Sequence, residues 1–163
     1  MAASESIRDA MKNLLNIVEI VASLLLAAIW LVAGISKIFY YSFLAQMLQD
    51  FGFFSLEMQL LAALWLPWFE VFVGIAHLLP ETRKQAFRVS AALMLAFGCW
   101  NAYVLFSGYK GKCGCFGQSD LPLTWLHVLA NGILCVVSAY FSQLAIFKNL
   151  CVRFRSYSNS FSS

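Results

Sequence analysis

The stretch from Ile17 to Ser36, which reads IVEIVASLLLAAIWLVAGIS, decides the fold of this chain. Its only charged residue is Glu19, and its length matches the ~20 apolar residues that a helix needs to cross roughly 30 Å of hydrocarbon. The stretch is too long for the apolar core of a signal peptide, and the acidic residues Glu5 and Asp9 precede it. The sequence therefore predicts a transmembrane helix here.

Three further apolar runs follow, over Gln59–Leu79, Val89–Ser107 and Thr124–Phe147. Apolar residues make up 61% and charged residues 12% of the 163 residues, whereas soluble proteins carry roughly 25% charged residues. Because lipid offers no hydrogen-bond partner to an open backbone, each run is expected to be a helix. We therefore predict an all-α membrane protein. Its single four-helix transmembrane domain in the lipid bilayer covers residues 1–155, and a polar tail covers residues 156–163.

Basic residues set the expected orientation of the chain, because they favour the cytoplasmic side. On one side of the predicted membrane, eight basic residues are expected: Arg8, Lys12, Arg83, Lys84, Arg88, Lys148, Arg153 and Arg155. On the other side, three are expected: Lys37, Lys110 and Lys112. This count predicts that both termini are cytoplasmic and that the loop between the third and fourth spans is extracytoplasmic, as in a bacterial inner membrane protein. No basic arm is present, so no nucleic-acid partner is predicted.

The loop between the third and fourth spans contains two thiols, Cys113 and Cys115, separated by one glycine. The neighbouring Lys110 and Lys112 favour the reactive thiolate form of a cysteine. A disulfide across a single residue is expected to be strained, and strained, exposed disulfides exchange readily. The sequence therefore favours a redox-active pair.

Two other interpretations of the cysteine pair stay open. The pair is an inert structural disulfide in one of them. In the other it is half of a metal site, for which His127 is the only further soft ligand nearby. We favour redox exchange over both and predict no metal site.

Polar residues also occur inside the predicted spans. Lys37, Glu70, His127 and Asn131 are expected in the outer half of the bundle, where ionisable groups are costly and usually functional. A carboxylate at the depth of Glu70 needs Lys37, a proton or a polar cavity, so we predict a functional role for it. Lys37 and His127 are its expected supports, and Asn131 also suits a hydrogen bond between helices. In the second span, one helix face is predicted to carry Ala63, Pro67, Glu70, Gly74 and His77.

Three further residues of the spans are predicted to have no chemical role. His77 lies near the inner end of the second span and is expected in the interface, and Cys99 and Cys135 are expected to be small core residues.

The same residues resemble the MauE family, DoxX-like four-helix membrane proteins named for methylamine utilisation. The resemblance rests on Gly34-x-x-Lys37, on Pro67-x-x-Glu70-x-x-x-Gly74 and on the loop segment Cys113-Gly114-Cys115-Phe116-Gly117. It extends through Asn131-x-x-Leu134 in the fourth span, although Ala130 stands where the family pattern has a basic residue.

The resemblance implies a helper in the maturation of an extracytoplasmic, disulfide-containing protein. In the system that names the family, the client is methylamine dehydrogenase and a thioredoxin-like protein is the partner. The DoxX-like relatives add a quinone as a candidate electron acceptor, by analogy. Cys113, Cys115 and Glu70 are the expected catalytic residues of a thiol–disulfide oxidoreductase, with Lys37, Lys110, Lys112, His127 and Asn131 in support.

Two functions of other classes stay open. A non-enzymatic scaffold or chaperone would need only a permanent disulfide that pins the loop. A small transporter would use Glu70 and Asn131 to line its path, but four short spans without an internal repeat make transport the weakest alternative.

Overall fold

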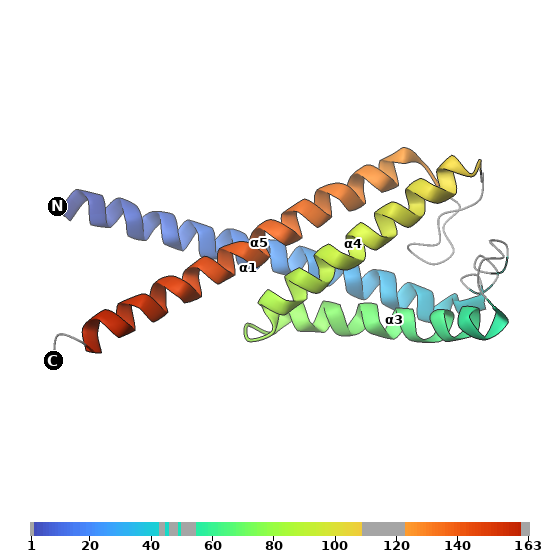
Figure 1. Cartoon of the computed structure of the whole chain (residues 1–163), viewed down its shortest axis with the longest axis horizontal. Coiled ribbons are helices and arrows are strands. Elements are labelled where there is room, and N and C mark those ends of the chain that lie inside the picture. Colours follow the sequence, from blue (N-terminus) through green and yellow to red (C-terminus); the bar gives the residue numbers. More distant parts are fainter. Residues whose placement is uncertain (1, 43–44, 46–48, 50–54, 109–122, 161–163) are drawn as a thin grey trace. The chain divides into compact units, whose positions relative to one another are not determined.

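The computed structural model describes residues 2–42, 45, 49, 55–108 and 123–160. In these ranges it contains four long helices, α1 (Ala2–Phe39), α3 (Leu56–Leu78), α4 (Arg83–Phe106) and α5 (Trp125–Ser160) (Figure 1). Each includes a segment long and apolar enough to cross a membrane. The prediction of an all-α membrane protein with four spans is thereby confirmed, whereas the cytoplasmic location of the termini stays a prediction.

The helices are longer than the apolar runs at both ends of the chain. α1 begins at Ala2, ahead of the predicted span start at Ile17. α5 continues to Ser160, past the predicted span end at Phe147 and into the segment predicted as a polar tail. The prediction counted apolar residues, but charged and polar side chains also form helices at little cost outside the hydrocarbon.

The described chain divides into two compact units. The first contains α1 and α3, and the second contains α4 from Lys84 onwards and α5. The single domain over residues 1–155 stays a prediction.

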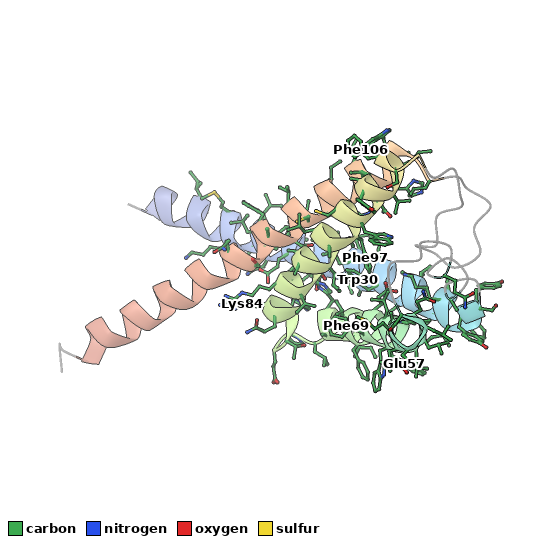
Figure 2. All side chains as sticks on the ribbon, turned by 45° about the vertical axis from the view of Figure 1, so that its right-hand side comes forward. Trp30, Glu57, Phe69, Lys84, Phe97 and Phe106 are labelled. Atoms are coloured by element: carbon green, nitrogen blue, oxygen red, sulfur yellow. The ribbon has the colours of Figure 1, made fainter. Side chains whose placement is uncertain are left out.

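The first unit is built on one face of each helix. The buried face of α3 comprises Gln59, Ala63, Pro67, Glu70, Val73, Gly74 and His77, which includes the whole predicted stripe. α1 contributes a matching face of buried residues: Ser23, Leu26, Ala27, Trp30, Ala33 and Lys37. Figure 2 shows Trp30 on α1 and Phe69 on α3. Intervals of three and four residues place each set on one side of its helix, and exposed apolar side chains such as Leu25, Trp65 and Phe72 cover the other sides.

The polar carbonyls at the end of α3 are satisfied by the turn that follows it. The hydroxyl of Thr82 donates a hydrogen bond of 2.8 Å to the carbonyl of Ala76, and Nε of Arg83 lies 3.4 Å from the carbonyl of His77. The last carbonyls of a helix have no partner within it. These two side chains therefore close α3 where the chain turns toward α4.

The second unit joins α4 and α5 through aromatic and sulfur contacts. The rings of Phe87 and Phe141 stack with centroids 5.4 Å apart, and the thiol of Cys135 lies 3.3 Å from the carbonyl of Ala91. At the other end of this pair of helices, Phe106 meets Trp125 edge to face at 5.0 Å (Phe106 in Figure 2).

Candidate functional site

The contact between α1 and α3 contains a buried ion pair. Nζ of Lys37, in the last turn of α1, lies 2.8 Å from both carboxylate oxygens of Glu70. The two side chains are 6% and 0% exposed, respectively. Of the three ways in which a carboxylate at this depth can be satisfied, which are Lys37, a proton or a polar cavity, the structure shows the contact with Lys37.

Such a pair is costly to form and hard to break. Removing two charges from water costs several kcal/mol per ion, and attraction offsets that cost only where the hydrogen bonds are well made. In this structure both oxygens of Glu70 accept from the same ammonium, so the carboxylate is held in one orientation. Loss of either partner would leave a lone charge inside the contact.

Two glycines bring the helices close enough for this pair to form. A Cβ atom at Gly34 would lie 2.7 Å from the carbonyl oxygen of Pro67 and 3.0 Å from the backbone nitrogen of Val71. A Cβ atom at Gly74 would lie 2.8 Å from the side chain of Leu31. Small residues at helix contacts are the usual means of close approach between spans. The Gly34-x-x-Lys37 and Glu70-x-x-x-Gly74 patterns thus place each charged residue within one turn of a close backbone contact.

A second polar contact lies in the same unit, near the opposite end of α3. The hydroxyl of Ser23 on α1 donates a hydrogen bond of 2.7 Å to the carbonyl of His77, and it lies 3.2 Å from Nδ1 of the same residue. Because the serine hydroxyl has a single hydrogen, which it gives to the carbonyl, an imidazole with its hydrogen on Nδ1 suits the second contact.

Sequence reasoning missed this contact. It placed His77 in the interface at the inner end of the second span, whereas the side chain is fully buried. It assigned no role to Ser23. The available signal was the spacing of Ser23, Ala27 and Trp30, which puts the hydroxyl on the face of α1 that packs on α3.

His127 caps its own helix. The backbone N–H of Thr124, the residue before α5, donates to Nδ1 of His127 at 3.2 Å, and the hydroxyl of Thr124 lies 3.1 Å from the same atom. This arrangement is one half of a capping box, in which the side chain of the third helical residue accepts a hydrogen bond from the backbone N–H of the N-cap residue. The structure thus gives His127 a local role, and its predicted support of Glu70 stays a prediction.

Asn131 also bonds within α5. Its side-chain amide donates to the carbonyl of His127 at 3.0 Å. This hydrogen bond lies within its own helix, and the bond to a neighbouring helix that the sequence suggested for Asn131 stays a prediction. Its role in a functional site stays a prediction.

The loop residues of the predicted site, Cys113, Cys115, Lys110 and Lys112, lie outside the described residues. Two cysteines within the described ranges, Cys99 and Cys135, are free thiols. Cys99 is exposed, so its expected place as a small core residue is wrong, whereas Cys135 is partly buried between α4 and α5. In the same ranges, no group of three or more metal-binding side chains is found.

Comparison with known proteins adds one match. The model of a family described as "Methylamine utilisation protein MauE" matches residues 14–144. This range contains Lys37, Glu70 and both loop cysteines. No curated protein and no solved structure matched the chain.

Proposed function

Because this chain belongs to the MauE family of membrane proteins, we propose that it is a thiol–disulfide redox protein that assists disulfide formation in an extracytoplasmic protein. The structural observation that supports the proposal most directly is the buried ion pair of Lys37 and Glu70. Ionisable residues inside transmembrane segments are rare and usually mark function. The sequence adds the loop thiols Cys113 and Cys115 as the reactive groups.

The proposed reaction is an exchange of one disulfide for another. A thiolate of the client attacks the Cys113–Cys115 disulfide, a mixed disulfide forms, and the second client thiolate releases it. The client gains a disulfide and the loop disulfide is reduced to two thiols, so two electrons and two protons move onto the pair. Lys110 and Lys112 stabilise the loop thiolates that leave in these steps.

The proposed role of the ion pair is in the reoxidation of the two loop thiols to the disulfide. In reoxidation by the disulfide of a thioredoxin-like partner, two electrons and two protons pass from the loop thiols to that partner. The carboxylate of Glu70 is proposed to take up transiently the thiol proton whose loss starts this exchange. Lys37 holds that carboxylate in place with hydrogen bonds to both of its oxygens. Glu70 is thus proposed as a proton-handling residue and Lys37 as the residue that positions it.

A quinone is the class of electron acceptor that the DoxX-like relatives suggest, by analogy. The carbonyl oxygens of a quinone need hydrogen-bond donors, and the ammonium of Lys37 is the strongest donor near Glu70. In the structure this ammonium already bonds both oxygens of Glu70. The observed arrangement therefore does not fit a quinone at Lys37, and no step is routed through one.

A scaffold is the second candidate function, and one observation favours it. The ion pair and the tight glycine contacts beside it are also what a rigid, static pair of helices needs. In that function the loop disulfide would be permanent, and the partner protein would be held without thiol exchange.

Trapping of a mixed disulfide distinguishes the two functions. Cys113→Ser and Cys115→Ser variants are expressed in native membranes, and free thiols are blocked with acid and a maleimide before electrophoresis without reductant. If the chain exchanges disulfides, one of the two variants retains the attacked cysteine and forms a covalent adduct with a thioredoxin-like partner or client. The adduct disappears on reduction and is identified by mass spectrometry.

The control variants are Cys99→Ser and Cys135→Ser, because both residues are free thiols in helices away from the loop in sequence. These variants should behave like the wild type. Absence of an adduct from both loop variants, with the wild-type loop disulfide locked, would favour the scaffold.

A further inference from the structure

Pro67 interrupts the backbone hydrogen bonds of α3 on the face that packs on α1. It lies inside the helix and is buried, as is Ala63 one turn earlier. Because proline has no backbone N–H, the carbonyl of Ala63 does not receive the hydrogen bond that residue 67 of an unbroken α-helix would donate to it. The buried face of α3 therefore has one backbone carbonyl that the helix itself does not engage.

The packing of α1 on α3 places this carbonyl beside Lys37. The two helices run in opposite directions (Figure 1), and a Cβ atom at Gly34 would lie 2.7 Å from the carbonyl oxygen of Pro67. Lys37 follows Gly34 by about one turn, and Ala63 precedes Pro67 by about one turn. In antiparallel helices these two steps go the same way, so Lys37 and Ala63 lie at nearly the same level.

The side chains of the ion pair approach the carbonyl from opposite directions. Helical side chains lean toward the N-terminus of their own helix, so Lys37 leans toward the level of Glu70, and Glu70 leans back toward the level of Ala63. These two levels are about 10 Å apart at ~1.5 Å per residue. The carbonyl oxygen of Ala63 points toward the C-terminus of α3, which is the direction of Glu70. Ammonium, carboxylate and carbonyl thus converge near Pro67.

A further acceptor for Lys37 matters whenever Glu70 is neutral. In the structure the ammonium donates to both oxygens of Glu70. A protonated carboxyl group turns one of these oxygens into an O–H donor, and a buried ammonium that loses part of its partner is strongly destabilised. His77, the other titratable side chain on the buried face of α3, lies about 10 Å beyond Glu70 along the helix, on the side away from Lys37. The carbonyl of Ala63 is the nearer acceptor.

We propose that Pro67 is a positioning residue of the ion pair: it opens the Ala63 carbonyl, which accepts a hydrogen bond from Lys37 while Glu70 holds a proton. This inference rests on the proposed function, in which Glu70 takes up the thiol proton transiently. The ammonium exchanges two carboxylate oxygens for one carboxyl oxygen and one backbone carbonyl, and it returns when the proton leaves. Lys37 thereby stays charged and hydrogen-bonded throughout the exchange.

Solid-state NMR of the full chain in lipid bilayers tests the contact. Glu70→Gln imitates the neutral carboxyl group, lysine Nζ is labelled with ¹⁵N, and the alanine carbonyl carbon is labelled with ¹³C. A hydrogen bond brings these two nuclei within about 4 Å, a distance that dipolar dephasing measures. We expect the short distance in Glu70→Gln and a longer one in the wild type. Its disappearance when Ala63→Ser is added, since serine carries no label, assigns the signal to Ala63.

The role of Pro67 is tested in the same Glu70→Gln background. Adding Pro67→Ala restores the N–H that bonds the Ala63 carbonyl within the helix, so the short distance should be lost. Adding Gln59→Leu is the control, because Gln59 is the other polar residue buried on α3 before Pro67, and the short distance should remain. Absence of a short distance in Glu70→Gln, or its persistence after Pro67→Ala, would overturn the proposal.

The rate of loop reoxidation by oxidised glutathione gives a second test in the otherwise wild-type chain. Pro67→Ala should slow reoxidation by roughly tenfold or more, the effect of losing one hydrogen bond to a charged group. Pro80→Ala, in the turn after α3, is the matched control and should leave the rate unchanged. Equal rates for both variants would overturn the proposal. A wild-type loop that exchanges no disulfide would refute the proposed function itself, whereas the NMR distances would still decide whether Lys37 changes its acceptor.

Discussion

Replacing Glu70 by glutamine removes the charge that Lys37 binds while it nearly preserves the shape of the side chain. The ammonium of Lys37 lies 2.8 Å from both carboxylate oxygens, and both side chains are almost fully buried. Breaking a buried pair by removing one partner costs about 3–5 kcal/mol, because an uncompensated charge remains. Glu70→Gln and Lys37→Met are each expected to lower the free energy of unfolding by about this amount.

The double variant distinguishes an ion pair from two independent effects. Lys37→Met with Glu70→Gln leaves no lone charge, so it should lose less stability than either single variant. The free energy of unfolding can be measured by titration with SDS in mixed micelles, with tryptophan fluorescence as the signal. Glu57→Gln is the matched control, since Glu57 is exposed in the first turn of the same helix and its replacement should change stability by less than about 0.5 kcal/mol.

Two results would refute this account of the pair. If the double variant loses as much free energy of unfolding as the two single variants together, Lys37 and Glu70 do not interact. A loss for Glu70→Gln no larger than that for Glu57→Gln would mean that Glu70 is not held in a buried ion pair.

Three further predictions concern packing and hydrogen bonds, and each is checked by the same unfolding titration. Gly34→Ala should destabilise by about 1–3 kcal/mol because its Cβ would press on the α3 backbone, whereas Gly132→Ala, with nothing within 4 Å, should be neutral or stabilising by up to about 1 kcal/mol; equal effects would contradict the close approach. His127→Ala should cost about 1 kcal/mol because the backbone N–H of Thr124 loses its acceptor, while His127→Gln should retain most of the stability because glutamine suits the same position; a loss for His127→Gln as large as that for His127→Ala would argue against the capping role. Ser23→Ala should cost about 1–3 kcal/mol because it leaves buried polar groups with fewer partners, and an unchanged midpoint would show that the contact contributes nothing.

The four spans and the buried stripe of α3 could be predicted from the sequence. Apolar runs of bilayer length leave no alternative to helices, and intervals of three and four residues assign a face without any structure. Lys37 was one of three alternatives, with a proton and a polar cavity, that the sequence offered for a carboxylate at the depth of Glu70, and the structure shows the contact with Lys37.

Other features depend on information that the pattern does not contain. The registry of α1 on α3, and with it the contact between Ser23 and His77, depends on where the glycines allow the backbones to meet. The capping role of His127 depends on the point at which α5 begins, and helix ends are poorly specified by apolar runs. The exposure of Cys99 could not be predicted, because the third apolar run is apolar on every side of its helix.

The central claim is that the loop pair Cys113–Cys115 cycles between disulfide and dithiol. The most direct measurement is a glutathione redox titration in native membranes, followed by a membrane-impermeant maleimide and mass spectrometry of the loop peptide. We predict that the pair is accessible from the side opposite the termini and changes state in the range of known exchange proteins, roughly −270 to −120 mV. A pair that stays oxidised under mild reductant, or stays reduced throughout, would contradict the redox function and leave the scaffold in its place.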